Sequence, residues 1–346
     1  KTFMWPKSFW YKVYEPFIRK AAGFGVASIK HDKERYEHKY EYCDLLITGS
    51  GPSGLASAYA AAKNGARVIL AEDKPRFGGS LLTSEVNIGN QSGKEWAENI
   101  ITELKGMPNV IVRNRAQVFG YYDHNMLVMS ERVNDHLAKS KKYSPKQRLW
   151  YIRAKEVVIS SGSIERPLVF GNNDTPGVVL SSAAKEYLKV YGVLVGRNPL
   201  IFTNNDSGYE TAIEFKKNGI WPVILDTRNN PNSEIVDEAK QMGIDIKFSH
   251  VVVAAKGYKK VKSAEIAKIS EDKKELGPIK NINCDCICVS GFWTPTIHLT
   301  SQSGNKTRFN EEIDAFVPGK SKQEETTVGS ANGIFTLEET LKTSFE

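Results

Sequence analysis

Cysteine is scarce in this sequence of 346 residues, and long apolar runs are missing. The four cysteines are Cys43, Cys284, Cys286 and Cys288. They are too few for a disulfide framework at this length, which favours a reducing, cytoplasmic compartment. Because no stretch reaches the ~18 consecutive apolar residues of a membrane span, we expect no membrane contact. Lysines interrupt the first apolar groups, which argues against a signal peptide, and a chain opening on Lys1 is expected to be a fragment or a processed product.

Patterns typical of catalytic residues are also missing. The six histidines are scattered, and no G-x-S-x-G, H-E-x-x-H or Walker A pattern occurs. Zinc sites usually combine a C-x2-C pair with a second pair or a His-x3-His, and the sequence has neither. Cys284, Cys286 and Cys288 alternate along an expected strand, so we expect all three on one face, as buried thiols rather than as a metal or redox site. The sequence therefore predicts no catalytic residue and no metal site in this chain.

Positive charge and aromatic rings gather in residues 1–40, which we call the leader. The leader holds nine Lys and Arg against four Asp and Glu, and ten aromatic residues, whereas the rest of the chain is near neutral. Such a segment could bind nucleic acid, since phosphates attract Lys and Arg and bases stack on rings. We favour the alternative that its rings are buried against another surface while its charges stay in water. The rings expected to be covered, by the body of this chain or by a partner subunit, are Trp5, Phe9, Trp10, Tyr14 and Phe17.

Strand and helix patterns alternate along the rest of the chain, and its length suits about two domains. A first set has strands at 42–48, 66–71, 109–112, 150–153 and 157–159, helices from 55 and after a Ser92-x-x-Glu95 capping box, and a hairpin at 116–133 with a lysine-rich tip at 139–148. A second set has strands at 200–202, 222–225 and 284–289, helices at 208–217 and 233–242, and an extended stretch at 244–253. This alternation predicts parallel sheets in an α/β fold.

A glycine-rich turn between the first strand and the first helix carries the strongest chemical signal. In the run Gly49-Ser50-Gly51-Pro52-Ser53-Gly54, Gly49 allows a tight turn and Gly51 lets the backbone approach a pyrophosphate. Gly54 lets the helix pack on the strand. Glu72, at the end of the next strand, suits the ribose hydroxyls and would repel a 2′-phosphate. This arrangement predicts a site for NAD or FAD rather than NADP.

Two further turns bear on nucleotide binding. Gly78 and Gly79 follow the acid-bearing strand and place more bare backbone near the dinucleotide, and Arg76 could reach a phosphate or a ribose. The second set of elements repeats the strand–turn–helix–strand order at 199–226, but its turn reads Thr203-Asn204-Asn205-Asp206-Ser207-Gly208. Side chains at Thr203 and Asn205 would crowd a pyrophosphate, so we expect this second nucleotide site to be degenerate. A site for another ligand there stays open.

Several of these runs together resemble a known family. They are the run Phe3-Met4-Trp5-Pro6, the glycine turn with Gly78-Gly79-Ser80-Leu81-Leu82, the run from Ser163 to Phe170 that contains Glu165-Arg166-Pro167, the run from Asn205 to Tyr209, and the run from Val328 to Phe335. The sequence resembles the alpha subunit of heterotetrameric sarcosine oxidase over essentially its whole length, with the alpha subunits of amino-acid and opine dehydrogenases as close cousins. The resemblance implies a two-dinucleotide-binding-domain flavoprotein (Rossmann-like) architecture with a β-hairpin insertion.

What the resemblance implies for cofactors and partners goes further. In that family the alpha dinucleotide site holds NAD as a tightly bound, non-redox ligand. FAD lies in the beta subunit, where the amine is oxidised, and FMN lies at the alpha–beta interface. The ferredoxin-like and folate-binding modules of the family have no counterpart in this sequence, so folate chemistry is not assigned to it. The chain is expected to be the middle of an alpha subunit, in a complex with further small subunits and a beta-type flavoprotein subunit, without nucleic acid.

We expect three parts in the chain. They are the leader at 1–40, a first dinucleotide-binding domain at 41–170 and 285–346, and a second, degenerate nucleotide-binding-like domain at 171–284. The residues expected to bind the dinucleotide are Gly49, Gly51, Pro52, Ser53, Gly54, Glu72, Asp73, Arg76, Gly79, Ser80, Leu81, Val118, Ser161, Gly162, Gly329 and Asn332. Two other functions stay open at this point: a self-sufficient flavoenzyme with FAD in the Gly49–Glu72 site, and a non-catalytic nucleotide-binding scaffold.

Overall fold

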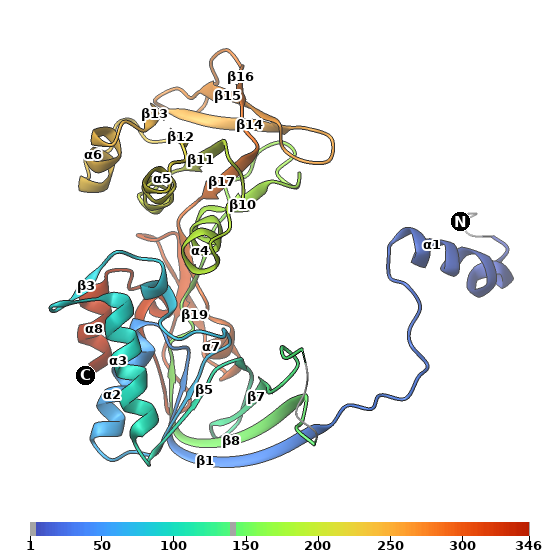
Figure 1. Cartoon of the computed structure of the whole chain (residues 1–346), viewed down its shortest axis with the longest axis vertical. Coiled ribbons are helices and arrows are strands. Elements are labelled where there is room, and N and C mark those ends of the chain that lie inside the picture. The colour runs from blue at the N-terminus through green and yellow to red at the C-terminus, as the bar shows by residue number, and fades with distance from the viewer. Residues whose placement is uncertain (1–4, 139–142, 346) are drawn as a thin grey trace.

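The computed structural model describes residues 5–138 and 143–345 of the chain. Its leader begins with three short helical segments, η1 (Lys7–Phe9), η2 (Trp10–Tyr14) and α1 (Glu15–Ala21). An extended stretch then joins them to the body, and the helices lie well apart from it (Figure 1). Trp5 is 71% exposed and Phe17 is 74% exposed. The body of the chain therefore does not cover these two rings. Cover by a partner subunit, the other alternative that we expected, stays a prediction.

A first sheet forms the lower half of the body in Figure 1, in the strand order β5-β2-β1-β8-β7-β6, with β21 paired to β8. Strands β1, β2, β5, β8 and β21 run parallel, while β6, β7 and β8 pair antiparallel as the predicted hairpin insertion. The strands are β1 (Tyr36–Thr48), β2 (Val68–Ala71), β5 (Val110–Arg113), β6 (Ala116–Tyr122), β7 (Met126–Arg132), β8 (Gln147–Ile159) and β21 (Glu325–Thr327). The first five residues of β1 were predicted as leader. The predicted tip at 139–148 lies partly outside the described residues.

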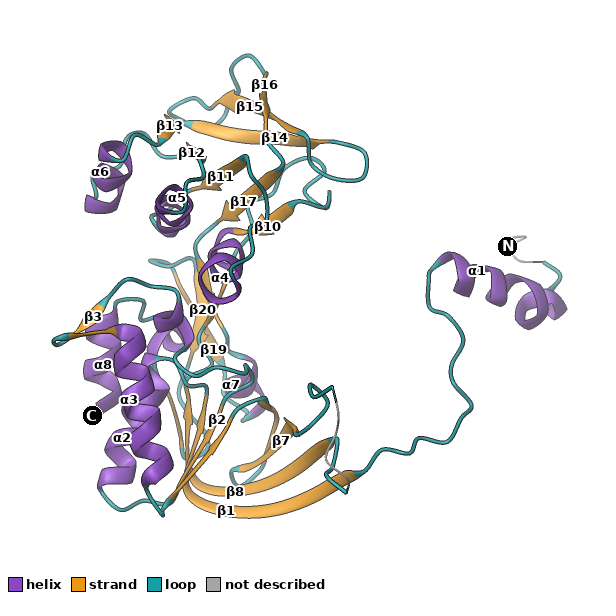
Figure 2. Ribbon diagram, viewed as in Figure 1, coloured by secondary structure: helices purple, strands orange, loops and turns teal. Residues whose placement is uncertain are grey.

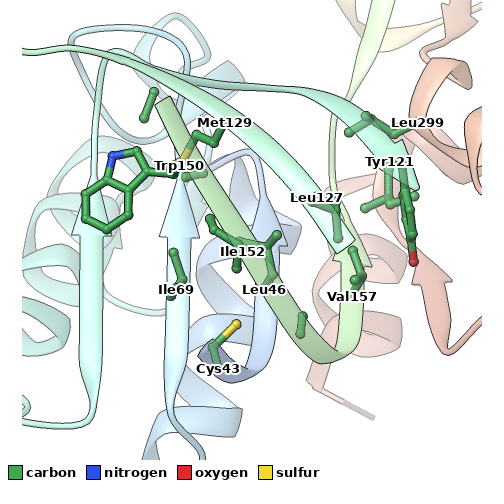
Figure 3. Packing of buried hydrophobic residues seen from close by; sticks show 14 residues of the cluster. Cys43, Leu46, Ile69, Tyr121, Leu127, Met129, Trp150, Ile152, Val157 and Leu299 are labelled. Atoms are coloured by element: carbon green, nitrogen blue, oxygen red, sulfur yellow. The ribbon is translucent and has the colours of Figure 1, made fainter. Parts of the chain in front are cut away.

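Both faces of this sheet are buried. One face packs against α2 (Pro52–Lys63) and α3 (Gly93–Gly106), with α8 (Leu337–Phe345) against α2 (Figure 2). The predicted capping box at the start of α3 is confirmed, since Ser92 Oγ accepts from the Glu95 N–H and the Glu95 carboxylate accepts from Ser92. On the other face a core joins β1, β7 and β8 to Leu299 of the short helix α7 (His298–Gln302) (Figure 3).

A second sheet, wholly parallel, forms the upper half of the body in the order β10-β17-β11-β12-β13. Its strands are β10 (Val178–Leu180), β11 (Pro199–Thr203), β12 (Val223–Asp226), β13 (Asp245–Phe248) and β17 (Cys286–Ser290). Helices cover one face: α4 (Ser181–Tyr191), α5 (Ser207–Lys217) and α6 (Glu234–Gln241). An antiparallel sheet covers the other: β14 (His250–Lys256), β15 (Ser263–Lys268) and β16 (Lys280–Asn283). The predicted α/β architecture with two such units and a hairpin insertion is confirmed.

Two short strands connect the units. β9 (Ser163–Glu165) leads out of the first sheet and pairs antiparallel with β18 (Trp293–Pro295), which leads back. Because β17 is bonded between β10 and β11, the chain returns to the first unit after Ser290 rather than at the expected boundary of 284/285. The remaining short elements are β3 (Asn87–Ile88), β4 (Gln91–Ser92), β19 (Thr307–Asn310), β20 (Ala315–Pro318), η3 (Gly79–Leu82) and η4 (Gly329–Asn332).

Two details differ from the sequence-based prediction. The stretch 244–253 is not continuous, because Ser249 has φ of 53° and separates β13 from β14. The three cysteines near β17 are buried as predicted, but they do not share a face. Cys286 and Cys288 pack under the helices, whereas Cys284 precedes the strand and packs with the opposite core. Within the described part of the chain, no helix combines the length and the apolarity needed to cross a membrane.

Candidate functional site

A cavity of about 980 Å³ lies between the two units, where β1, β2 and β8 end. Its volume is at the upper end of the roughly 300–1,000 Å³ typical of ligand and cofactor sites. Twelve of the sixteen residues predicted to bind a dinucleotide line it: Gly49, Gly51, Pro52, Ser53, Glu72, Asp73, Gly79, Ser80, Leu81, Val118, Ser161 and Gly162. The carboxyl ends of parallel strands are where open α/β sheets bind ligands, so the cavity occupies the expected place.

The glycines of the first turn serve different purposes. A Cβ on Gly49 would lie 2.4 Å from the Ser160 carbonyl oxygen, and Gly49 has φ of 102°, so packing and backbone both require glycine there. A Cβ on Gly54 would lie 2.0 Å from the Gly49 oxygen, so only glycine at this position lets α2 pack so close to the turn. At Gly51 a Cβ would meet no atom within 4 Å, because this residue borders the cavity. The packing of the fold therefore does not require glycine at position 51, and the bare backbone there leaves room for a ligand.

The start of α2 adds electrostatic attraction for an anion. Gly51 is the N-cap of this 12-residue helix and has no side-chain cap, and Pro52 follows at the first helical position. Free N–H groups and the helix dipole at such an end favour phosphate. Gly79 closes in from the side, since a Cβ there would lie 2.8 Å from the Gly51 Cα. Gly79 thus packs directly on the backbone of the first turn, where a side chain would not fit.

Glu72 lies directly after β2, at the predicted position, and is almost fully buried. Its Oε2 accepts from the Ser50 N–H at 2.9 Å and from the Ser50 Oγ at 2.5 Å. Its Oε1 accepts from the Lys74 N–H at 2.9 Å. The pKa of Glu72 is raised to about 7, first by burial and second by a hydrogen bond with Asp73, while the bonds from Ser50 and Lys74 oppose the rise. The carboxyl group therefore joins the glycine turn to the end of the neighbouring strand.

Four predicted residues do not line the cavity. Gly54 lies beneath the turn, as its packing requires. Arg76 is exposed outside the cavity. Gly329 and Asn332 belong to η4, of which only Ser330 reaches the cavity. Gly329 instead packs on the start of α2, where a Cβ would lie 2.7 Å from Ser53 Oγ.

Polar side chains of the second unit fill the turn that corresponds to the glycine run of the first. Thr203 Oγ1 accepts from the Asn205 N–H at 3.1 Å and donates to the Asn205 carbonyl at 2.8 Å. Asp226, the acid that ends β12, is fully buried, and it accepts from Tyr209 at 2.7 Å and pairs with Arg228 at 2.9 Å. Arg228 also pairs with Asp206 at 2.8 Å. The groups that would meet a nucleotide in a working site bond to one another here.

The sequence-based prediction missed the wall of the cavity that the second unit supplies. Helix α4 was not predicted, and its Ser182, Lys185 and Glu186 all line the cavity. Glu186 pairs with Lys74 of the first unit at 2.8 Å. The signal that could have revealed α4 is an apolar stripe at Ala184, Leu188 and Tyr191 followed by Gly192, a typical C-terminal stop.

Three buried or aromatic residues at the connection between the units were also missed as lining residues. Glu165 of β9 is 3% exposed, and its Oε2 accepts from the Ser182 N–H at 2.7 Å. Burial raises the pKa of Glu165, and the contacts with Ser182 oppose the rise. Phe292 and Trp293 contribute rings to the cavity wall. The sequence pattern assigned these rings no role because β18, which begins at Trp293 directly after Phe292, and its partner β9 are each only three residues long.

Comparisons with known proteins show which proteins this chain is similar to. The family model for pyridine nucleotide-disulphide oxidoreductases matches residues 43–317. The chain is 39% identical to the alpha subunit of sarcosine oxidase from Rhizobium meliloti (strain 1021), over 96% of this chain and 32% of that protein. It is 24% identical to an opine oxidase subunit from Agrobacterium tumefaciens (strain Ach5), over 83% of this chain and 59% of that protein. The predicted resemblance to the alpha subunit of sarcosine oxidase is confirmed, and the relative that acts on opines is an oxidase subunit where we expected opine dehydrogenases.

A solved structure shows the same fold. The thioredoxin reductase of T. acidophilum superposes with a TM-score of 0.66 at 17% identity, covering 88% of this chain and 95% of that one. The chain spans about a third of the length of the sarcosine oxidase alpha subunit that it matches. On the match of the family model to most of its length, together with the glycine turn and acid at the expected edge of the first sheet, the chain belongs to the pyridine nucleotide-disulphide oxidoreductase family.

Proposed function

We propose that this chain is an oxidoreductase subunit of the sarcosine oxidase type, and that its cavity binds NAD. The observation that carries the proposal is the open space at Gly51, which lies between the start of α2 and the buried acid Glu72. A pyrophosphate on Gly51 would meet bare backbone and free helix N–H groups, and an adenosine ribose would lie toward Glu72. The family resemblance implies NAD rather than FAD as the occupant, and the 39% identity to a sarcosine oxidase alpha subunit supports that resemblance.

The residues of the site fit a dinucleotide better than a mononucleotide. The cavity extends from Glu72 and Val118 on one side of the glycine turn to Gly162 on the other, and on to the second unit. Gly51 itself has no protein atom within 4 Å of the place of a Cβ, and Gly79, which packs against it, adds no side chain there. We propose the sixteen predicted residues as the binding region, with Gly54, Gly329 and Asn332 shaping it from beneath and Arg76 at its outer margin.

The proposed catalytic centre lies on a partner. By the resemblance, a beta-type subunit holds FAD and oxidises the secondary N-methyl amine sarcosine. Water then releases glycine and a one-carbon unit, and molecular oxygen accepts the two electrons and becomes hydrogen peroxide. FMN is proposed at the interface between the two subunits. The flavins supply the redox chemistry, and this chain contributes binding surface and NAD. The exposed rings of the leader support a partner, because a free surface of this kind is rarely left in water.

The division of the chain stays part of the proposal. We propose the leader, a first domain that binds the dinucleotide, and a second domain without a nucleotide. The strand pairing supports ending the second domain after Ser290, because β17 belongs to the second sheet.

Identification of the bound nucleotide tests the proposal directly. The chain is purified, heated or acidified to release ligands, and the supernatant is analysed by mass spectrometry and absorbance. A colourless chain that releases NAD supports the proposal. A yellow chain that releases FAD would instead favour a self-sufficient flavoenzyme, and a chain that neither carries nor binds a dinucleotide would contradict both.

A further inference from the structure

The order of strands dictates where the two halves of a dinucleotide lie in the cavity. This argument rests on the proposed function. The glycine turn follows β1, and the sheet places β2 on one side of β1 and β8 on the other. Glu72 follows β2, so the adenosine half lies on that side. The other half must then extend over the end of β8, toward Gly162 and the strands β9 and β18 that connect the units.

Phe292 stands at that end of the cavity in an unusual backbone conformation. Its φ is 78°, and among the described residues that line the cavity it is the one non-glycine residue with positive φ. Glycine adopts this region freely, whereas a side chain as bulky as phenylalanine is strained there. The neighbouring hydrogen bonds impose the conformation: the Arg166 N–H donates to the Phe292 carbonyl at 2.8 Å, and the Gly291 N–H donates to the Arg166 carbonyl at 2.7 Å. Strain of this kind tends to persist at functional sites.

Two further rings complete an aromatic corner around Phe292. The rings of Phe292 and Phe335 meet edge to face, with centroids 5.2 Å apart and planes at 65°. Trp293 is fixed by a hydrogen bond from its Nε1 to Ser207 Oγ at 2.9 Å. All three residues line the cavity and stay partly exposed. Because Ser207 begins α5 of the second unit, the bond to Trp293 ties this corner to both units.

We propose that Phe292, supported by Phe335 and Trp293, forms a subsite that packs against the flat heteroaromatic ring of the non-adenosine half of the dinucleotide. Under the proposed function this ring is the nicotinamide of NAD. A planar ring gains from offset or edge-to-face contact with aromatic side chains. The strained backbone at Phe292 is retained because it turns the ring toward the cavity.

The test compares two ligands that differ only in that ring. Binding of NAD and of ADP-ribose, which lacks the nicotinamide, is measured by titration calorimetry on the full, nucleotide-free chain. We expect the wild-type chain to bind NAD more tightly than ADP-ribose. In Phe292→Gly and Phe292→Ala, NAD affinity falls by between about 2- and 12-fold, the range for one aromatic contact, while ADP-ribose affinity is unchanged.

A control and a second readout separate the ring from the fold. Phe309 and Phe316 form an edge-to-face pair of similar geometry outside the cavity, with centroids 5.3 Å apart, so Phe309→Ala is expected to leave both affinities unchanged. Thermal unfolding of the nucleotide-free variants then tests the strain. Phe292→Gly should melt at a higher temperature than Phe292→Ala, the reverse of the usual order, because glycine alone relaxes the positive φ.

Each other outcome has a definite meaning. Equal affinity of the wild-type chain for NAD and ADP-ribose, or an equal loss of both in Phe292→Gly, overturns the ring subsite and leaves the proposed dinucleotide site standing. A glycine variant that melts no higher than the alanine variant overturns the strained presentation of the ring. A wild-type chain that binds neither ligand overturns the proposed function, and the subsite with it.

Discussion

Glu72 accepts two hydrogen bonds from a single residue, Ser50, at 2.9 Å from its N–H and at 2.5 Å from its hydroxyl. Ser50 stands between Gly49 and Gly51, so the acid that follows β2 holds the turn that follows β1, where we propose the pyrophosphate to bind. A ribose that hydrogen-bonds to Glu72 must share or displace these contacts. Ser50 and Glu72 therefore link the proposed adenosine end of the site to the proposed pyrophosphate end.

The raised pKa of Glu72 makes nucleotide affinity depend on pH. Burial places this pKa at about 7, so the carboxyl group is largely protonated below neutrality. Ribose hydroxyls donate best to the carboxylate, so binding favours its ionised form. We expect affinity for NAD to rise as pH rises through about 7, measured by calorimetry between pH 6 and pH 8. The matched variant Glu72→Gln should show no such rise, and an equal rise in both chains would contradict the assignment.

The titration of Glu72 should also make stability depend on pH, but stability should fall with rising pH whereas affinity rises. The folded chain holds a proton on Glu72 between the ordinary pKa of 4.5 and about 7, whereas the unfolded chain has lost it. The contribution of Glu72 to the free energy of unfolding therefore falls as pH rises across this window. Thermal melts of the nucleotide-free chain and of Glu72→Gln across the window measure the difference. If the contribution of Glu72 instead grew as pH rose, the pKa of Glu72 would not be raised in the folded chain.

Substitutions at two glycines of the same turn should affect nucleotide binding and folding separately. Gly51→Val places a branched side chain where we propose the pyrophosphate to lie, and a Cβ there meets no protein atom within 4 Å. We expect the variant to fold normally and to lose the dinucleotide. Gly54→Ala, by contrast, puts a Cβ 2.0 Å from the Gly49 oxygen and should destabilise the fold by about 1–3 kcal/mol. Melting curves and nucleotide content of the two variants decide, and full nucleotide occupancy in Gly51→Val would show that the turn is not the site.

The second unit should not admit a diffusing pyridine nucleotide. Arg228 is paired with both Asp206 and Asp226, and the Tyr209 hydroxyl also donates to the Asp226 carboxylate. We expect equilibrium dialysis to give one dinucleotide per chain rather than two. Added NADH or NADPH should also fail to bleach any bound flavin at a catalytically useful rate in a stopped-flow experiment. Rapid bleaching by either would show that the turn at 203–208 opens.

The leader should be needed for association and not for folding. Removal of residues 1–25 takes away exposed rings that the body does not cover, so the melting temperature should not change. Affinity for a co-purified beta-type flavoprotein subunit should fall by at least about 10-fold, as for the loss of buried aromatic anchors. Light scattering measures the association. Lys12→Ala serves as the control, since a charge at the margin of a contact affects the rate and salt dependence of binding more than its strength. Unchanged affinity after truncation would exclude the leader as the docking element.

The sequence predicted most of the first unit because its signals are local. Gly49 and Gly54 sit in a strand–turn–helix pattern that depends on neighbouring residues, and Ser92 and Glu95 cap a helix three residues apart. The cavity wall formed by α4 could not be predicted in the same way. It depends on how the second sheet is turned toward the first, and the ion pair between Lys74 and Glu186 joins positions 112 residues apart. Cys284 shows the same limit, since alternation alone could not reveal that the strand begins only at Cys286.

The four thiols lie in three layers of the molecule: Cys43 in the core of the first sheet, Cys284 on one side of the second sheet, and Cys286 with Cys288 on the other. Burial raises the pKa of Cys43 and of Cys284 to about 12, which keeps these thiols protonated and slow to react. An alkylating reagent can therefore reach each thiol only when its own layer opens. The rates at which the four positions become labelled, read by peptide mass spectrometry, would give the opening free energy of each layer in the native chain without any engineered probe.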